Sequence, residues 1–174
     1  NKFVLHTVPS GIFREGTMNF IGNGVVVDPV NLMDEIHQIE KISSCVKDKL
    51  LISKRAHLIL PTHRMLDAAS ESAKGKSKIG STLKGIGPTY TDKTGRNGLR
   101  FGDILAPDFE QRYKALKDRH MEILSMYPDF TVDIEEYEAK WFAAIEELRS
   151  YKIADIEFIL NDMLIKDASV LAEG

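Results

Sequence analysis

Residues 74–100 combine glycine, hydroxyl and cationic side chains in a way that could hold a phosphate group. This segment has seven Lys or Arg residues and one acid, Asp92, in a chain whose formal net charge is −3. Its glycines leave backbone N–H groups able to face an anion, and Ser81 and Thr82 add hydroxyl donors. The segment therefore predicts a phosphate-binding loop, with a merely solvated basic loop as the alternative.

Among the cations of this segment, Arg96 is the strongest candidate for a phosphate contact. A guanidinium binds two phosphate oxygens at once and keeps its charge at any working pH. Lys93 lies three residues earlier, on the same side of a helical turn. Gly75 and Gly80 have the spacing of a P-loop, but Ser81 stands where that motif requires lysine, so a Walker-type loop is excluded.

The other polar residues give weaker signals. The five histidines show no metal-ligand spacing, and we interpret them as surface or hydrogen-bonded core residues. Asp92 is interpreted as an ion-pair partner on a helix surface rather than as a catalytic group. A catalytic thiol at Cys45 has little support, because no histidine accompanies it in the sequence. The residues of this chain therefore predict binding and supply no convincing general base.

Length and composition restrict the class of protein. A chain of 174 residues with 43% hydrophobic residues is long enough for one domain with a real core. Its net negative charge argues against general affinity for nucleic acids or membrane surfaces. No apolar run approaches the roughly 18 to 20 residues that span a bilayer. A single cysteine favours a reducing compartment, and the cytoplasm is the expected location.

Strand and helix patterns alternate over residues 1–73 and predict an α/β layer. We expect strands at residues 3–8, 50–53 and 56–60, and an apolar stretch broken by glycines at 20–27. A helix over 29–41 has Asp28 as its N-cap, and a second helix covers 62–74. Residues 75–87 show neither the strand period nor the helical period of apolar residues, which predicts a loop. A short helix is expected to follow from about Pro88.

Residues 103–174 are predicted to be helical. Capping-box patterns at Asp108 and Asp133 precede two amphipathic segments, and a third segment begins near Asp155. Trp141 falls on a helix face, which favours core packing. The expected fold class is α/β, with strands in the first third packed against helices, then the basic glycine-rich loop, then a helical carboxyl-terminal third.

The segment 85–96, GIGPTYTDKTGR, resembles the signature G-I-G-P-x-Y-x-x-K-x-x-R of the adenylosuccinate synthetase family. Four more segments are similar to family segments in the same order, so the resemblance covers nearly the whole chain. These segments are HTVPSGI at 6–12, IGNGVV at 21–26, IGST at 79–82 and GLRFGD at 98–103.

The resemblance implies an enzyme that couples IMP to L-aspartate, in which GTP phosphorylates the IMP 6-oxygen and Mg²⁺ assists. It also implies a homodimer and a larger, P-loop-like central-sheet domain. Thr82, with Ser81 beside it, matches the family residue that binds the IMP 5′-phosphate. Arg96 matches the arginine that reaches the IMP of the other subunit, and Lys93 matches the signature lysine, expected near the same phosphate.

The family pattern extends beyond both ends of this chain. The G-D-E-G-K-G-K loop and the G-H-T segment, which carry the family's catalytic aspartate and histidine, would precede Asn1, and the G-A-Q-G segment with the guanine and aspartate sites would follow Gly174. We therefore expect the chain to be an internal fragment of one domain, with a strand and helix portion at 1–73, the phosphate-binding loop and signature at 74–102, and a helical portion at 103–174. Most Mg²⁺ and GTP ligands would lie outside this fragment, and the fragment alone would be inactive. The alternative is a free-standing nucleotide- or RNA-binding or dimerisation module without catalysis.

Overall fold

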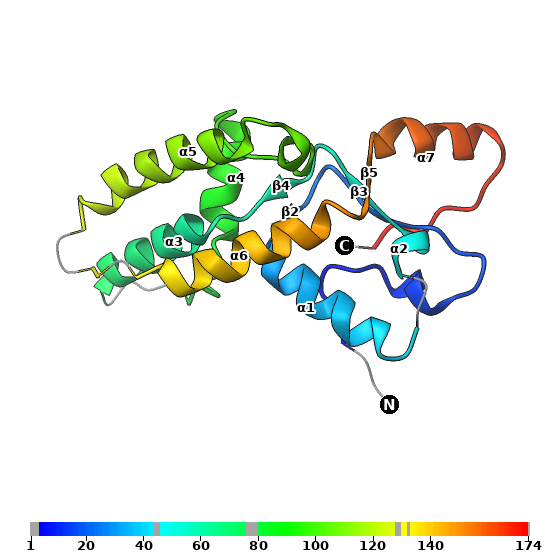
Figure 1. Ribbon diagram of the computed structural model, residues 1–174, viewed down its shortest axis with the longest axis horizontal. Helices are drawn as coiled ribbons and strands as arrows, with labels where there is room; N and C mark the ends of the chain where they lie inside the picture. Colours follow the sequence, from blue (N-terminus) through cyan, green and yellow to red (C-terminus); the bar gives the residue numbers. More distant parts are fainter. Residues whose placement is uncertain (1–3, 44–45, 76–79, 128–129, 132, 174) are drawn as a thin grey trace.

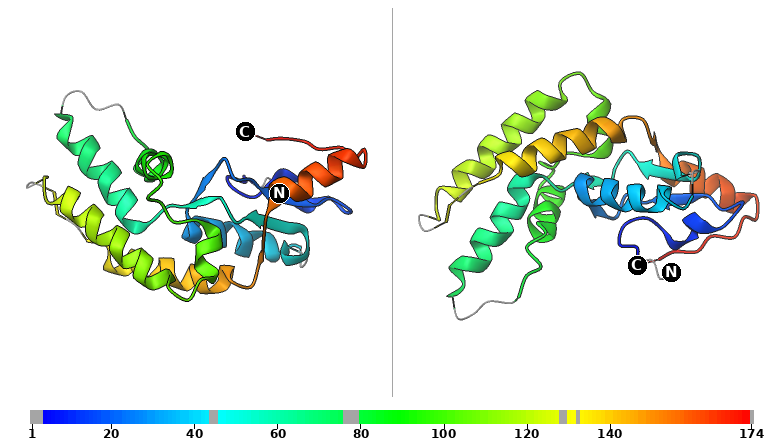
Figure 2. Two further views of the ribbon diagram at one scale, coloured as in Figure 1. Left: turned by 90° about the horizontal axis from the view of Figure 1, so that it is seen from above. Right: turned by 60° about the horizontal axis from the view of Figure 1, so that its bottom comes forward.

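The structure is a computed structural model that describes residues 4–43, 46–75, 80–127, 130–131 and 133–173. Helices and short strands alternate along the chain, and the long helices lie around and beside the strands (Figures 1 and 2). In chain order the elements are η1 (Ser10–Phe13), β1 (Asn19–Ile21), β2 (Val26–Val27), α1 (Pro29–Glu40), α2 (Val46–Lys49), β3 (Leu50–Ser53), β4 (His57–Leu58), α3 (Pro61–Ala73), α4 (Ile86–Thr94), η3 (Phe101–Leu105), α5 (Phe109–Leu124), α6 (Glu135–Leu148), β5 (Lys152–Ala154) and α7 (Ile156–Ile165).

The strands of the described residues form two parallel sheets. In the larger sheet β3 is central, and its Leu51 is in register with Phe20 of β1 and with Lys152 of β5. In the smaller sheet, Val26 of β2 is in register with His57 of β4. Every residue of β3 is buried, which is typical of a parallel strand covered on both faces. The expected α/β class is therefore confirmed.

The helices form two groups around these sheets. α1 packs against α6, and α3 packs against both α4 and α5, whereas α7 contacts β3 at the other end of the molecule (Figure 1). Trp141 of α6 is fully buried between these groups, and its indole N–H donates to the carbonyl of Ile59 at 2.8 Å. Its ring lies 5.0 Å from that of Tyr113, so the prediction of core packing for Trp141 is confirmed.

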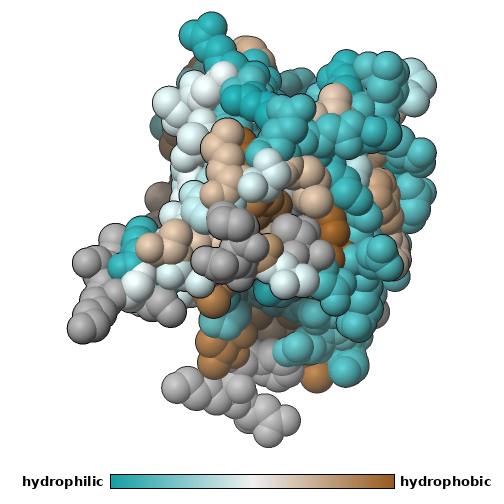
Figure 3. Space-filling model, turned by 90° about the vertical axis from the view of Figure 1, so that its left-hand side faces the viewer, coloured by the Kyte–Doolittle hydropathy of each residue, from teal (hydrophilic) through white to brown (hydrophobic). Residues whose placement is uncertain are grey.

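The surface is polar over much of the end that carries α3 and α5. Figure 3 shows hydrophilic residues over most of this face, with hydrophobic residues in smaller areas between them. At the opposite end, α7 exposes Phe158, Leu164 and Ile165. No helix in the described part of the chain combines the length and the apolarity needed to cross a bilayer.

The beginning of α1 follows the sequence prediction. Asp28 is its N-cap, and one carboxylate oxygen accepts from the backbone N–H groups of Val30 and Asn31. Pro29 occupies the first helical position, where the missing N–H would have no intrahelical partner in any case. The helix ends at Glu40, one residue before the expected end. This element was therefore predictable from its capping residues and its apolar spacing.

The strand predicted at residues 3–8 is wrong for residues 4–8, and residue 3 lies outside the described part of the chain. The backbone N–H groups of His6, Thr7 and Val8 donate to the carboxylate of Glu35 on α1, at 2.9 to 3.1 Å for their shortest contacts. Because a helix side chain satisfies these donors, no neighbouring strand is needed. An apolar residue such as Val8 is therefore buried here although it does not belong to a strand.

The carboxyl-terminal third departs from the predicted all-helical pattern at β5, which pairs with β3. Neither capping box is formed as predicted. Asp108 precedes α5, but its carboxylate binds Arg112 Nε at 2.8 Å instead of a backbone N–H. α6 begins at Glu135 with Ile134 as its N-cap, one residue later than Asp133 would place it. These acids therefore mark the approximate starts of the helices without capping them.

Candidate functional site

The signature segment forms α4, which lies against α3. Gly85 precedes α4 with φ +76°, a left-handed conformation that glycine adopts without steric cost. A Cβ at Gly85 would lie 2.8 Å from the backbone nitrogen of Arg64, so α3 and α4 approach too closely for any other residue. The Gly85 carbonyl accepts from both the backbone N–H and the hydroxyl of Thr89. These contacts start the helix at Ile86, two residues before the predicted Pro88.

The loop that precedes α4 is held by two carboxylates of α3. Glu71 Oε1 accepts from the backbone N–H groups of Gly80, at 2.7 Å, and Ser81, at 3.3 Å. Asp67 accepts from the Ser81 hydroxyl at 2.7 Å through one oxygen and from the Gly85 N–H at 3.0 Å through the other. The bonds from Gly80 and from the Lys74 ammonium lower the pKa of Glu71. Residues 76–79 of the predicted loop lie outside the described residues.

The two adjacent hydroxyl residues predicted to bind phosphate differ in their surroundings. Ser81 is half-buried and is bound to Asp67. Thr82 is exposed, and no hydrogen bond to its side chain is found among the described residues. Lys84, two residues further, is exposed as well. The structure thus places Thr82 where an external ligand can reach its hydroxyl.

Lys93 projects from α4 toward the turn between β1 and β2. Its ammonium donates to the carbonyls of Asn23 at 2.7 Å and Gly24 at 3.0 Å, and the hydroxyl of Tyr90 donates to the same Gly24 carbonyl. Burial, with the nearby charge of Arg100 as a second cause, lowers the pKa of Lys93. Since an ammonium has three donors and two are used here, one N–H remains for another acceptor.

Arg96 follows the carboxyl end of α4, whereas Thr82 precedes its amino end. Arg96 is exposed and adopts φ +61°. The turn around it is held by the Asp92 carbonyl, which accepts from the backbone N–H groups of Asn97 at 2.9 Å and Gly98 at 3.3 Å. A nine-residue helix such as α4 is roughly 13 Å long. Thr82 and Arg96 of one chain therefore lie beyond opposite ends of α4 in the sequence.

The side chain of Asp92 is the centre of a buried polar cluster, so its interpretation as a helix-surface residue is wrong. Asp92 Oδ2 lies 3.0 Å from His63 Nε2 on α3 and 2.8 Å from His120 Nε2 on α5. Burial opposes ionisation of Asp92, but the hydrogen bonds from His120 and His63 outweigh it and hold the pKa of the carboxyl well below its usual range. The prediction that histidines are hydrogen-bonded core residues is confirmed for His63 and His120.

The hydrogen bonds of this cluster define the tautomer of His63 and the partners of His120. The Leu60 backbone N–H donates to His63 Nδ1 at 2.9 Å, so the proton of neutral His63 lies on Nε2 and faces Asp92. Burial lowers the pKa of His63 and favours this neutral form. The Thr62 hydroxyl lies 2.7 Å from His120 Nδ1, which leaves the His120 Nε2 proton for Asp92. With Asp92 ionised, both Nε2–H groups donate to its carboxylate, and each Nδ1 has a partner among these contacts.

His63, Asp92 and His120 have ligand atoms near enough to one another to hold a metal ion. Coordination through His63 Nε2 would place the remaining ring proton on Nδ1, where it would meet the Leu60 N–H donor. Mg²⁺ in particular prefers oxygen ligands, whereas this cluster offers two imidazole nitrogens. The donor set therefore fits a hydrogen-bonded cluster that joins α3, α4 and α5, and it does not fit a Mg²⁺ site.

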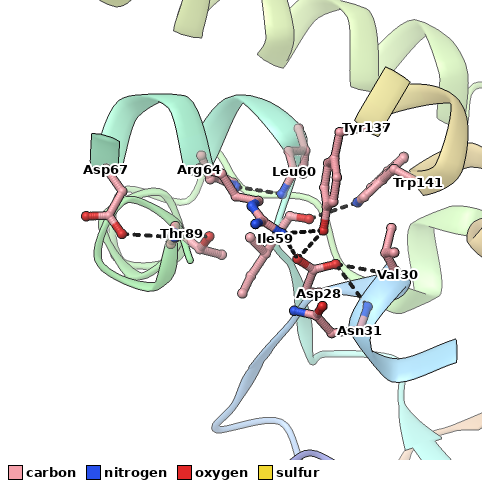
Figure 4. A network of polar contacts seen from close by, with 12 residues as sticks. Asp28, Val30, Asn31, Ile59, Leu60, Arg64, Asp67, Thr89, Tyr137 and Trp141 are labelled. Carbon is pink, nitrogen blue, oxygen red and sulfur yellow. Dashed lines mark hydrogen bonds and ion pairs between the residues drawn. The ribbon is translucent and has the colours of Figure 1, made fainter. Parts of the chain in front are cut away.

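A second polar network joins α1, α3 and α6 (Figure 4). Arg64 Nη1 donates to Asp28 Oδ2 at 3.2 Å, and the Tyr137 hydroxyl donates to the same oxygen at 2.6 Å. The Arg64 guanidinium also lies 4.3 Å from the centre of the Tyr137 ring. Burial and the Asp28 carboxylate raise the pKa of Tyr137. Asp28 thus caps α1 and at the same time ties it to α6 and to α3, the helix that holds the loop before α4.

Sequence reasoning missed the residues of α3 that organise the site. Asp67 and Glu71 are four residues apart on a helix, a spacing that puts both carboxylates on one face. This spacing, beside a loop rich in N–H donors and cations, was the available signal. His63 gave no such signal, because its side-chain partner Asp92 lies 29 residues away in the sequence.

A parallel α/β arrangement with a basic, glycine-rich loop before a helix is typical of proteins that bind phosphorylated ligands. The family model described as adenylosuccinate synthetase matches residues 1–174. The chain therefore belongs to the adenylosuccinate synthetase family. The resemblance that the signature segment indicated is confirmed.

Individual relatives agree with this family. The adenylosuccinate synthetase of Flavobacterium johnsoniae is 53% identical over 174 residues, which are 99% of this chain and 41% of the relative. That of Bacteroides fragilis is 51% identical over 173 residues, again 99% of this chain and 40% of the relative. The solved structure of fully ligated adenylosuccinate synthetase from Plasmodium falciparum has a TM-score of 0.85 and 30% identity, and the match covers all of this chain and 40% of that one. The chain thus spans about two fifths of the length of these relatives.

Proposed function

We propose that this chain is the part of an adenylosuccinate synthetase that binds the 5′-phosphate of IMP and contributes to the contacts of a homodimer. The protein would condense IMP with L-aspartate, consume GTP with Mg²⁺, and release adenylosuccinate, GDP and phosphate. The observation that carries the proposal is the exposed Thr82, whose hydroxyl has no partner among the described residues, in the loop before the signature helix. A match to the family over residues 1–174 supports it.

GTP and Mg²⁺ belong to this proposal only through the family. Among the described residues, the candidate metal cluster of His63, Asp92 and His120 does not fit Mg²⁺. No described residue of this chain is therefore assigned to the metal. The contribution proposed for this chain is to bind and orient the nucleotide.

Arg96 supports the dimeric part of the proposal. The helix α4 lies between Thr82 and Arg96 in the sequence, and the two residues of one chain are proposed to bind different phosphates. An exposed, permanently charged guanidinium at the end of a fixed turn is suited to an anion on a facing subunit. We propose that Arg96 binds the IMP phosphate of the second subunit. Lys93, with one unused N–H, stays a candidate for the same phosphate.

Arg96→Leu in the full-length protein tests this assignment. Loss of a charge-assisted pair should raise KM for IMP about tenfold or more, with little change in stability. Arg14→Leu is a matched control, because Arg14 is also exposed and has no side-chain partner among the described residues. A KM unchanged by Arg96→Leu would contradict the proposal.

Subunit mixing distinguishes action on the second subunit from action within one chain. Arg96→Leu is mixed with a variant disabled at the catalytic aspartate that the family resemblance places outside this chain. A mixed dimer would then hold one site with both residues intact, and some activity should return. If subunits exchange and no activity returns, Arg96 does not act on the second subunit.

A further inference from the structure

We infer that Asp67 and Glu71 are positioning residues that select which loop hydroxyl meets the ligand phosphate: they retain Ser81 and present Thr82. This inference rests on the proposed function, because it assumes that the loop before α4 binds a phosphate. It assigns a role to two carboxylates of α3 that touch the loop rather than the ligand. Its basis is that these carboxylates accept from the N–H groups of Gly80, Ser81 and Gly85 and from the Ser81 hydroxyl.

The hydroxyl of Ser81 has no proton left for a phosphate. Its single O–H donates to Asp67 Oδ1 at 2.7 Å, and its oxygen accepts from the backbone N–H of Leu83 at 3.3 Å. A phosphate oxygen is an acceptor and needs a donor. Ser81 can therefore bind a phosphate only after it leaves Asp67, whereas Thr82 needs no such exchange.

The same carboxylates determine the path of the backbone on both sides of Thr82. Glu71 binds the N–H groups of Gly80 and Ser81, and Asp67 binds the N–H of Gly85. Figure 4 shows Asp67 on α3, directed toward the start of α4. Between these anchors Leu83 adopts φ +54°, which is unfavourable for a residue other than glycine and requires support from its surroundings.

Charge does not prevent a phosphate from binding on the outer side of the loop. Glu71 is buried and is paired with Lys74 at 3.1 Å, and Asp67 is half-buried behind Ser81. The outer side carries Thr82 and the exposed cation Lys84. The carboxylates therefore act on the inner side of the loop, while the donor and the positive charge available to an anion lie on the outer side.

If these carboxylates instead competed with the phosphate, removing them would change the affinity for IMP in the opposite direction. If Asp67 and Glu71 occupied the N–H groups that a phosphate itself must bind, they would compete with it. Removing Asp67 would then tighten the binding of IMP. If they position the loop, removing Asp67 weakens that binding, because Thr82 is no longer presented in one place.

The test measures dissociation constants of IMP and of inosine, which lacks the phosphate, by calorimetry on the full-length protein. We expect Thr82→Val and Asp67→Ala each to weaken IMP binding about tenfold and to leave inosine binding unchanged. Glu71→Ala should act like Asp67→Ala. Glu71→Gln should restore most of the affinity, because the oxygen that accepts from Gly80 and Ser81 is retained.

Two controls separate positioning from a loss of folding. Asp162→Ala removes an exposed carboxylate on α7, at the other end of the molecule, and should change neither constant. Amide hydrogen exchange should be faster at Ser81 and Gly85 in Asp67→Ala, while the amides of α5 keep the protection of the wild type.

The possible outcomes are distinct. Tighter or unchanged IMP binding in Asp67→Ala overturns the inference. A loss of IMP affinity in Ser81→Ala as large as that in Thr82→Val overturns it as well. If the wild-type protein binds inosine as tightly as IMP, the proposed phosphate site itself is wrong, and the inference falls with it. A loss for Thr82→Val together with wild-type affinity for Asp67→Ala supports the phosphate site and rejects the positioning role.

Discussion

Replacement of Asp92 by alanine should strongly destabilise the fold. Asp92 Oδ2 accepts from Nε2 of both His63 and His120, and all three residues are buried. Alanine would leave two buried N–H donors without an acceptor, each at about 1 to 3 kcal/mol. We expect a loss of about 2 to 5 kcal/mol in the free energy of unfolding, which is a large fraction of the stability of a typical domain.

Urea unfolding of the full-length protein at neutral pH measures this loss. Asp92→Asn is an informative variant, because both histidines donate to the same oxygen and an amide oxygen can replace it without the charge. Its loss should be smaller than that of alanine. Asp118→Ala, which breaks an exposed ion pair with Lys114, should change stability by less than about 1 kcal/mol. A loss for Asp92→Ala no larger than that for Asp118→Ala would refute the reasoning.

Two further predictions concern the same helices. Burial lowers the pKa of His63 from its ordinary 6.5, so below that pH the unfolded chain binds a proton that the folded chain does not. Stability should therefore fall as pH decreases from 7.5 to 5.5, less steeply in His63→Gln, and equal slopes in urea titrations would contradict this. Gly85→Ala should cost roughly 2 kcal/mol or more, since it adds a left-handed Cβ against α3. At Gly87, which has open space, alanine should be neutral or stabilising by up to about 1 kcal/mol in the same assay.

The sequence predicted those elements whose information is local. α1 has its cap, its proline and its apolar spacing within one segment, and β3 is a short apolar run closed on both sides by polar residues. β5 was missed because residues 152–154 have an exposed and two half-buried positions, which give little period. Its strand character comes from its place beside β3 and not from its own residues.

The candidate site likewise contains some residues that the local sequence indicates and others that only the packing of the helices places. Thr82 and Arg96 could be selected because each lies in a contiguous segment of the sequence, IGST at 79–82 and the signature at 85–96. Asp92 was misplaced because its neighbours Lys93 and Arg96 suggested a charged surface, whereas its side chain points to His63 and His120 on two other helices. Hydrogen bonds between residues far apart in the chain produce no recognisable pattern in the sequence. Only the packing of α3, α4 and α5 shows them.

The fixed turn after α4 affects the entropy of binding at Arg96. The Asp92 carbonyl accepts from the N–H groups of Asn97 and Gly98, and its carboxylate is held in the core, so the backbone at Arg96 is already ordered. An anion that meets this arginine has to immobilise only its side chain, at up to about 2 kcal/mol, and not the backbone, which would add about 1 to 2 kcal/mol for each residue. The buried histidine cluster thus lowers the entropic penalty of a contact made on the surface.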